Sequence, residues 1–425
     1  MNTRKTGNEA VAALSLLHVS PQEAQVLDAL RRQAAVSRTD IARLSGWSRP
    51  KVTAIVNRLI DRGVLIETGE GESQGGRRPQ LLRLNTRLGY IVGLDIGATS
   101  IDLAVADLNA EVLLRESGPA DVREEPAVVL GEVKRRLSDM LRREGLRPEE
   151  VLGVGVGVPG PVDFAMGVLV APPLMPAWGG YPLRSFFHNL FPNAFVSVDN
   201  DVNMMALGEL RAGAGKGIDN FLYVKIGTGI GAGIICHGLV HRGSTGSAGD
   251  IGHISVDRKG PTCHCGNIGC LEIMAAGPAI ADRAAEAARN GASSILARKL
   301  EAHGGRLRSE DVGTAAREGD RVALEIIQSS GHMIGDVLAG LVNFFNPSLI
   351  LIGGGVANIG NQLLASIRQE VLRRSTALAT RELVISYSPM GPEAGVTGAF
   401  LLELDHLFVI DGTRWTTACQ IPAGE

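Results

Sequence analysis

The sequence predicts an α/β protein that begins with a winged helix-turn-helix domain. Three observations support this prediction: short helical segments followed by two strands between residues 21 and 88, an apolar strand with a glycine turn and a return strand near residue 95, and a similar unit about 130 residues later. The 425 residues are enough for roughly two to four domains with ample cores.

The composition is typical of a folded protein without a membrane-spanning segment. Hydrophobic residues make up 45% of the chain and charged residues 20%, and no run of 18 or more apolar residues could span a bilayer. Three of the five cysteines fall between residues 263 and 270, which is unlike an evenly spaced disulfide framework. We therefore expect a cytoplasmic protein whose clustered cysteines hold a metal.

Charge is distributed unevenly along the chain. Residues 1–88 contain 14 Lys and Arg against 8 Asp and Glu, a net charge of +6, which leaves −9 for residues 89–425. Residues 1–88 can therefore attract a polyanion such as a nucleic acid, whereas residues 89–425 cannot.

The first domain has the pattern of three helices. Glu23 to Leu30 is helical in pattern, Ser37 can cap a second short helix, and Ser45-Gly46-Trp47 forms a turn. Ser48 is expected to cap a third helix, which Gly63 ends. Apolar residues at helical spacing bury one stripe of this third helix, namely Val52, Ile55, Val56, Leu59 and Ile60.

The third helix and the hairpin after it predict a DNA-binding surface. Val64 to Ile66 and Leu81 to Leu84 read as two strands around a polar, Gly-rich tip at 69–76. In a winged helix-turn-helix the third helix enters the major groove, and arginines of the wing reach phosphate or the minor groove. The predicted DNA-binding residues are Ser48, Arg49, Lys51, Thr53, Asn57, Arg58, Arg77 and Arg78. A small helical packing domain is the alternative, but the donor types on the polar face of the third helix favour DNA binding.

From Tyr90 onward, three apolar strands each lead into a glycine-containing turn. The strands are Tyr90 to Ile96, Phe221 to Ile226 and Leu349 to Ile352; the turns after them are Gly97-Ala98-Thr99, Gly227-Thr228-Gly229-Ile230-Gly231 and Gly353-Gly354-Gly355. Return strands from Ser100 to Asp107 and from Ala232 to Cys236 follow the first two turns. Glycine lets backbone amides approach a phosphate that a side chain would block. One such turn is a weak signal, whereas the repetition indicates a duplicated fold that closes on a nucleotide.

The clustered cysteines predict a structural zinc site. Cys263-x-Cys265-x4-Cys270 supplies three thiolates, and one imidazole would complete the set of ligands that a closed tetrahedral zinc site takes. His253 lies ten residues upstream, His237 and His241 are the other candidates, and His264 would tend to point away from a metal held by its neighbours. The alternative is three buried free cysteines, but thiols in a core do not need this spacing.

A series of motifs, in order along the chain, resembles the ROK family (repressor, open reading frame, kinase). They are Asp95-Ile-Gly-Ala-Thr99, Asn200-Asp201, Gly227-Thr-Gly-Ile-Gly231, Gly249-Asp-Ile-Gly-His253, Cys263-His-Cys-Gly-Asn-Ile-Gly-Cys270-Leu-Glu272 and Ile352-Gly-Gly-Gly-Val356. The resemblance covers about residues 20–405, and the N-terminal domain with Gly75-Gly76-Arg77-Arg78-Pro79 is similar to the xylose-repressor and N-acetylglucosamine-repressor branch.

The resemblance implies an actin-like (ribonuclease H-like) sugar kinase fold, in which two α/β lobes enclose a cleft. The expected parts of the chain are an N-terminal arm or helix at 1–20, the winged helix-turn-helix at 21–88, a first lobe at 89–203 joined by a C-terminal helix at 393–408, a second lobe with the zinc site at 204–392, and a polar tail at 409–425.

The resemblance also implies roles for single residues. Asp201 follows the apolar strand Ala194 to Val198, and it matches the general base that takes a proton from a sugar hydroxyl in ROK kinases. By the same resemblance the sugar would be bound by Asn200, Asp201, Asp250, His253 and Glu272, and His253 would also be the zinc ligand. The implied nucleotide-binding residues are Asp95, Gly97, Thr99, Gly227, Thr228, Gly229, Gly353, Gly354 and Gly355. Asp199 is expected to turn away from the cleft because side chains alternate along a strand.

Two departures from the kinase pattern favour binding over turnover. The kinases usually have Gly-Gly-Thr where this chain has Gly97-Ala98-Thr99, and they usually place Glu where Asp250 stands. A methyl group on Ala98 crowds a phosphate, and Asp is one methylene shorter than Glu. ATP with Mg²⁺ is therefore an implied but uncertain cofactor, and we expect negligible ATP hydrolysis.

The function predicted from these observations is a DNA-binding transcriptional regulator, a repressor of carbohydrate-utilisation genes that a sugar or sugar phosphate releases from operator DNA. One alternative is an ATP-dependent sugar kinase with an attached DNA-binding domain, and another is a regulator controlled by a protein partner. One winged helix reads a short half-site, so a homodimer or homotetramer on a palindrome is expected.

Overall fold

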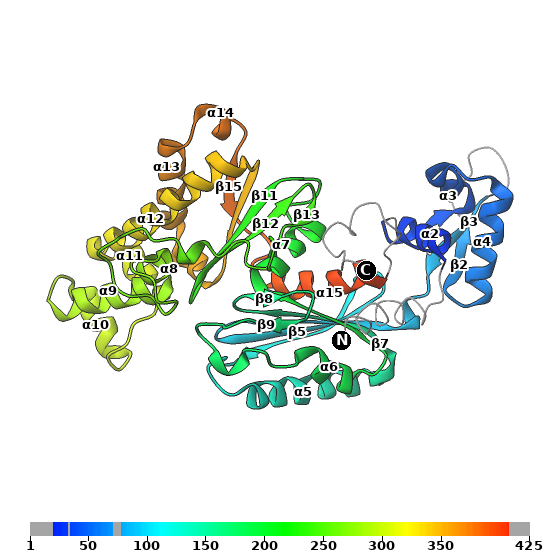
Figure 1. The fold of residues 1–425 in the computed structure, drawn as a ribbon, viewed down its shortest axis with the longest axis horizontal. Coiled ribbons are helices and arrows are strands. Elements are labelled where there is room, and N and C mark those ends of the chain that lie inside the picture. Colours follow the sequence, from blue (N-terminus) through cyan, green and yellow to red (C-terminus); the bar gives the residue numbers. More distant parts are fainter. Residues whose placement is uncertain (1–19, 33–34, 71–77, 408–425) are drawn as a thin grey trace, which may run out of the picture.

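The computed structural model of the chain describes residues 20–32, 35–70 and 78–407. Figure 1 shows a small domain set to one side of a larger body, and the body consists of two lobes. The predicted arm at 1–20, apart from its last residue, the wing residue Arg77 and the predicted tail at 409–425 lie outside the described residues.

The small domain has the predicted winged helix-turn-helix fold. Three helices pack against a three-stranded antiparallel sheet in which β3 lies between β1 and β2. The helices are α2 (Pro21–Arg32), α3 (Arg38–Ser45) and α4 (Arg49–Asp61), and the strands are β1 (Val36–Ser37), β2 (Leu65–Glu70) and β3 (Gln80–Leu84). The short strand β1 carries no sequence signal because it has only two residues.

Local signals place the ends of these helices. The Ser37 hydroxyl accepts a hydrogen bond from the Asp40 amide at 3.2 Å, so the predicted cap of α3 is confirmed. Gly63 has φ +70° and donates its amide to the carbonyl of Ile60 at 2.8 Å, which ends α4. The prediction for Ser48 is wrong in one respect: it occupies the cap position of α4, but its side chain makes no cap hydrogen bond. Pro50, in the first turn, has no N–H to offer it.

The two lobes of the body are built on five-stranded sheets of the same topology. In each sheet the first three strands form an antiparallel meander, and two later strands add in parallel to the first strand. The first sheet has the order β10-β7-β4-β5-β6, with β4 (Tyr90–Ile96), β5 (Ser100–Asp107), β6 (Val112–Pro119), β7 (Val151–Val158) and β10 (Phe195–Asn200). The second has the order β13-β12-β11-β14-β15, with β11 (Phe221–Ile226), β12 (Ile230–Cys236), β13 (Leu239–Val240), β14 (Leu349–Gly353) and β15 (Val384–Tyr387). The duplication predicted from the glycine turns is confirmed.

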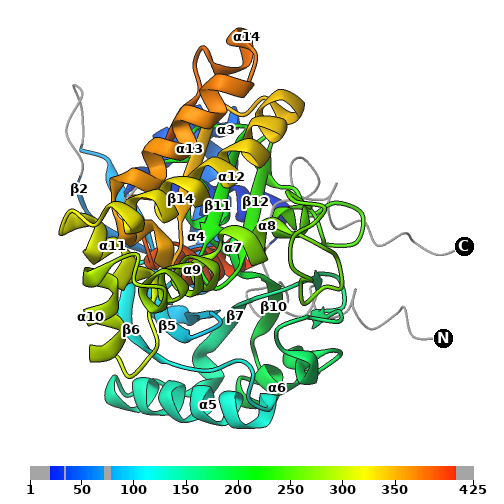
Figure 2. The same ribbon diagram turned by 90° about the vertical axis from the view of Figure 1, so that its left-hand side faces the viewer.

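Helices and sheets alternate in layers through the body. Helices α5 (Pro126–Arg143) and α6 (Leu183–Leu190) share a hydrophobic core with the outer face of the first sheet, and α12 (Arg321–Phe345) and α13 (Asn361–Arg374) share one with the outer face of the second. Between the sheets lie α7 (Asp201–Ala212) and α15 (Glu393–Leu407), which pack closely on each other. Figure 2 shows α5 and α6 beneath the first sheet and α12 and α13 above it.

The remaining elements complete the two lobes. They are β8 (Val162–Asp163), β9 (Val168–Leu169), α8 (Leu271–Ala275), α9 (Gly277–Arg289), α10 (Ser294–Ala302), α11 (Ser309–Arg317), α14 (Ala377–Thr380) and the single 3-10 turns at Thr86–Leu88, Pro148–Glu150, Pro176–Trp178, Ile251–His253 and Gly355–Ile359. No helix among the described residues has both the length and the apolar character needed to cross a membrane.

The C-terminal helix begins before its apolar stretch. α15 runs from Glu393 to Leu407, over the range given above for this helix, whereas the apolar residues begin only at Ala399. Its first turns carry Gly395 and Gly398, and a Cβ atom added at Gly398 would overlap the carbonyl of Met204 in α7. The small residues in these turns let the backbone of the helix approach α7 closely. Hydrophobic periodicity does not reveal such a contact.

Candidate functional site

A cavity of about 1130 Å³ lies between the two lobes, where the parallel strands of both sheets end. All the sugar-binding and nucleotide-binding residues predicted from the sequence line it: Asp95, Gly97, Thr99, Asn200, Asp201, Gly227, Thr228, Gly229, Asp250, His253, Glu272, Gly353, Gly354 and Gly355. These residues span 261 positions of the sequence, from 95 to 355, so the duplicated topology brings them together.

The floor of the cavity on the first lobe is a row of acidic residues. Strand pairing aligns Asp95 of β4 with Gly157 of β7, and Gly157 with Asp199 of β10. Asp201 follows two residues later as the first residue of α7, and its side chain lines the cavity. Asp199 points elsewhere, because its carboxylate is paired with Arg242 at 2.7 Å and accepts a hydrogen bond from Asn203 at 3.0 Å. Asp199 is thus kept from the cavity by its partners, since its register with Asp95 places both residues on the same face of the sheet.

The sequence reading did not identify Lys225 of β11, which donates from its ammonium group to Oδ2 of Asp201. Lys225 belongs to the second sheet, so this ion pair joins the two lobes at the base of the cavity. Its side chain is 20% exposed, whereas that of Asp201 is 3% exposed. Lys225 is the one charged residue in the otherwise apolar strand Phe221–Ile226, a signal that could have marked it as functional.

Asp95 is a buried carboxyl that lacks a full set of partners. Among the described residues, its Oδ1 atom has no hydrogen-bond partner. Burial raises the pKa of Asp95 to about 7, Lys225 opposes this effect, and the negative charge of Asp201 adds to it. Burial therefore favours the protonated form of this carboxyl group.

Two of the proposed sugar-binding side chains also hold the site in shape. Asn200 caps α7, because its Oδ1 accepts from the Val202 amide at 2.9 Å while its Nδ2 donates to the carbonyl of Gly160 at 3.0 Å. Glu272 accepts a hydrogen bond from the Ile230 amide at 3.1 Å, next to the second glycine turn. Each retains polar capacity that faces the cavity, since an amide has two donors and a carboxylate about four acceptor positions.

Asp250 lines the cavity and is more exposed than Asn200 or Glu272. Burial raises the pKa of its carboxyl, and His253 partly opposes this effect.

The glycine turns bring backbone close to the cavity. Gly354 has φ +88°, and a Cβ atom added there would lie 2.5 Å from the carbonyl oxygen of Ile226. Only glycine meets both conditions without strain. The third glycine cluster therefore packs directly against the strand that leads into the second turn.

Three cysteines and one histidine form a cluster at one wall of the cavity. The ligand atoms of His253, Cys263, Cys265 and Cys270 all lie within 4.8 Å of one another, and His264, His237 and His241 are exposed and outside the cluster. The sulfurs of Cys265 and Cys270 are 3.7 Å apart, and the sulfur of Cys263 is 3.7 Å from Nδ1 of His253. A tetrahedral zinc ion with bonds of about 2.3 Å to sulfur needs sulfurs about 3.8 Å apart. The residues present therefore fit a metal ion.

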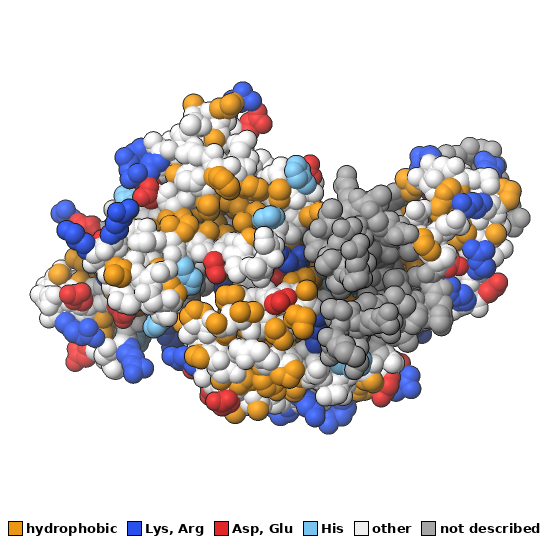
Figure 3. Space-filling view, in the orientation of Figure 1, with side chains coloured by type: hydrophobic (Ala, Val, Ile, Leu, Met, Phe, Trp, Pro, Cys, Tyr) orange, Lys and Arg blue, Asp and Glu red, His pale blue; other side chains and the backbone are white. Residues whose placement is uncertain are grey.

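The outer face of α4 is polar and accessible. All the predicted DNA-binding residues that the structure describes are exposed: Ser48, Arg49, Lys51, Thr53, Asn57, Arg58 and Arg78. Figure 3 shows Lys and Arg side chains over the surface of this domain. Three of these residues have partners that the sequence did not reveal. The Arg38 guanidinium donates to Asn57 at 3.2 Å, Arg58 pairs with Glu23 at 3.3 Å, and the Lys51 ammonium lies 4.4 Å from the centre of the Trp47 ring.

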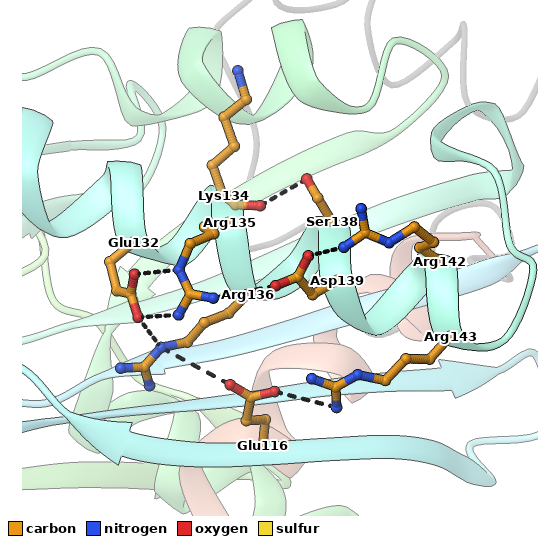
Figure 4. A network of polar contacts seen from close by, with 9 residues as sticks. All are labelled: Glu116, Glu132, Lys134, Arg135, Arg136, Ser138, Asp139, Arg142 and Arg143. Atoms are coloured by element: carbon orange, nitrogen blue, oxygen red, sulfur yellow. Dashed lines mark hydrogen bonds and ion pairs between the residues drawn. The ribbon is translucent and has the colours of Figure 1, made fainter.

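A second arginine-rich surface, on α5, is neutralised by its own carboxylates. Figure 4 shows Arg135 and Arg136 bound to Glu132, and Arg143 near Glu116 of β6 at 3.8 Å. Arg142 pairs with Asp139 in the same network. In contrast, no carboxylate of the described residues lies within 4 Å of Arg49 or Lys51 in ion-pair geometry. The two surfaces therefore differ in their capacity to meet a polyanion.

Comparison with known proteins matches both parts of the chain. Residues 91–406 match the ROK family, and residues 19–78 match the MarR family. The chain is 31% identical over 385 residues to the xylose repressor of Caldicellulosiruptor bescii, which covers 90% of this chain and 95% of that protein.

Two solved structures extend the comparison. The structure of a ROK family transcriptional regulator, a homologue of the E. coli MLC protein, has a TM-score of 0.77 and 27% identity, and it covers 94% of this chain and 97% of that one. A ROK family glucokinase from Streptomyces griseus, in complex with glucose and AMPPNP, has a TM-score of 0.65 and 30% identity, and it covers 74% of this chain and 99% of that one. The kinase lacks a counterpart to the remaining quarter of this chain. With the ROK match spanning well over half of its length behind a MarR-type helix-turn-helix, the chain belongs to the ROK family.

Proposed function

We propose that this ROK family member is a sugar-responsive DNA-binding transcriptional repressor of carbohydrate-utilisation genes. The observation that carries the proposal is the presence, in one chain, of an exposed DNA-reading helix and of a cavity lined by acceptors suited to sugar hydroxyls. The similarity to a xylose repressor over nine-tenths of the chain supports the same reading. The effector is a sugar or sugar phosphate, and the operator is bound through α4 and the wing.

Helix α15 is the element that can couple the cavity to the DNA-binding domain. Gly391 and Pro392, just before the helix, line the cavity, and a Cβ atom added at Gly395 would overlap the carboxylate of Asp95. At the other end, Leu404 and Leu407 belong to the same hydrophobic cluster as the core of the winged helix. A ligand that changes the fit of Asp95 against α15 would therefore act on a helix that shares a hydrophobic cluster with the DNA-binding domain.

The cysteine and histidine cluster holds a structural zinc ion in this proposal. Buried thiols at these distances and a single imidazole form the donor set that zinc prefers. His253 belongs to the cluster and also lines the cavity, so the metal would orient one of the sugar-binding side chains. Two copies of the chain, as a homodimer or within a homotetramer, would read the two halves of a palindromic operator.

Operator release tests the proposal directly. DNA fragments from the region upstream of the gene are bound to the full chain, and a panel of pentoses, hexoses, N-acetylated sugars and their phosphates is added while fluorescence anisotropy reports binding. One sugar should release the DNA, and Asp201→Ala should abolish the response without changing operator affinity in the absence of sugar. Asp219→Ala, an exposed carboxylate outside the cavity, is the matched control. A panel that stabilises the protein in a thermal-shift assay but never affects DNA binding would refute the repressor.

A sugar kinase with an attached DNA-binding domain is the second candidate. It is favoured by the three glycine turns and Asp201, which all face the cavity, and by the likeness to a glucokinase bound to glucose and AMPPNP. Formation of ADP that depends on one sugar of the same panel would identify this activity.

A further inference from the structure

The ion pair between Lys225 and Asp201 occupies the place where the two lobes converge on the proposed sugar site. Both oxygens of the Asp201 carboxylate are engaged, because Oδ2 accepts from the Lys225 ammonium and Oδ1 accepts from the Val202 amide at 2.9 Å. Lys225 is also close enough to Asp95 for the two charges to influence each other. One cation therefore faces two carboxyl groups of the cavity, those of Asp201 and Asp95.

This arrangement does not fit a divalent cation of the kind that accompanies ATP. Magnesium needs carboxylate oxygens that are free to coordinate it, usually one or two per site. Here the carboxylate of Asp201 is bound to an ammonium group, and burial favours the neutral form of Asp95, the other carboxyl group, whose Oδ1 is unpaired among the described residues. A dication beside either group would be repelled by Lys225. The glycine turns for a nucleotide are present, but the acidic residues beside them, Asp95 and Asp201, already have a positive charge near them in Lys225.

We infer that Lys225 is a positioning residue that serves as the resident cation of the cleft, holding Asp201 as a hydrogen-bond acceptor for a sugar hydroxyl while keeping divalent metal away. The inference rests on the proposed function and adds one property of the same site. Sugar binding at this site does not require ATP or a divalent cation.

The chemistry of Asp201 follows from its partner. A carboxylate oxygen that accepts one hydrogen bond can still accept a second one from a sugar hydroxyl. Taking the proton of that hydroxyl is different, because it would leave the Lys225 ammonium beside a neutral acid in a largely enclosed site. Lys225 therefore favours recognition of the hydroxyl over its deprotonation.

Binding of Mn²⁺ alone provides the first test. The full chain, supplied with one equivalent of Zn²⁺ so that the cysteine cluster is filled, is titrated with Mn²⁺, and free ion is followed by electron paramagnetic resonance. Lys225→Met and Lys225→Gln should bind one Mn²⁺ at least about tenfold more tightly than the wild type, because a like charge has been removed beside two carboxylates. Lys225→Arg retains the cation and should behave as the wild type. Lys216→Met, at an exposed lysine, is the control for loss of one positive charge.

The sugar response provides the second test. The midpoint of sugar-induced operator release by the wild type should be unchanged when Mg²⁺ and ATP are added. The inference is overturned if neither Lys225→Met nor Lys225→Gln gains Mn²⁺ affinity, or if Mg²⁺ and ATP move the wild-type midpoint more than about threefold, which exceeds the scatter of such curves. Failure of the proposed function is distinguishable, because Mn²⁺ binding is measured without sugar or DNA.

Discussion

Replacement of the buried carboxyl of Asp95 should make the protein more stable, and the gain should grow with pH. In the folded chain, burial raises the pKa of Asp95 from 3.8 to about 7. Between these two pH values the folded state holds a proton that the unfolded state has released, so stability falls as pH rises through the window. Asp95→Asn removes this dependence while keeping the shape of the side chain.

The magnitude follows from the two pKa values. Each pKa unit corresponds to about 1.4 kcal/mol, so the charge on Asp95 costs about 4 kcal/mol at pH 8. The difference in unfolding free energy between Asp95→Asn and the wild type should increase by about 2–3 kcal/mol from pH 5 to pH 8. Any constant effect of the amide on packing cancels in this comparison between two pH values.

Urea unfolding followed by tryptophan fluorescence measures this difference, since Trp178 is fully buried in the core of the first lobe. Asp219→Asn, at an exposed carboxylate, measures the general effect of removing one negative charge. If the gap between Asp95→Asn and the wild type stays constant from pH 5 to pH 8, or narrows, the account of Asp95 as a buried group that titrates near neutrality is wrong.

The other predictions concern the DNA surface, the metal and the coupling helix. Asn57→Ala should relax base preference at one operator position at a cost of about 1–3 kcal/mol, whereas Arg78→Ala should weaken binding to all sequences and reduce the slope of log affinity against log salt by about 1; footprints unchanged by both would remove the assignment. Protein purified without added metal should contain one zinc ion per chain by elemental analysis, and Cys265→Ser should lose both the metal and the sugar response. Gly395→Val should displace α15 from Asp95 and abolish sugar-induced release while operator binding persists; an unchanged sugar midpoint would exclude this helix as the coupling element.

The predictions made from the sequence agree best with the structure where the function depends on backbone shape or on residue spacing. The glycines at 227, 229 and 353–355 mark places where backbone approaches the cavity, and a missing side chain is visible in the sequence. The spacing of Cys263, Cys265 and Cys270 identifies a metal-binding loop in the same way. The choice of His253 over His237 and His241 came from the family resemblance, since all three imidazoles were available by residue type.

Agreement is poorest for charged groups and for ends of helices that are set by packing. Glu23 and Arg58 are 35 residues apart, and no periodicity links them. Ser48 occupies the cap position of α4 without a cap hydrogen bond, because Pro50 in the first turn has no N–H to donate.

The helix-turn-helix pattern, the duplicated glycine turns and the cysteine motif could be predicted from the sequence, because each depends on residues close together in the chain or on a repeated local spacing. Contacts between distant parts of the chain appear only in the folded molecule: Lys225 pairs with Asp201, Asp95 lies buried against Gly395, and Leu404 and Leu407 of α15 belong to a hydrophobic cluster that includes the core of the DNA-binding domain. These features depend on which strands pair and which helix lies between the two sheets. The ion pair between the two lobes exists because of that arrangement of strands and helices, and it cannot be read from the order of residues along the chain.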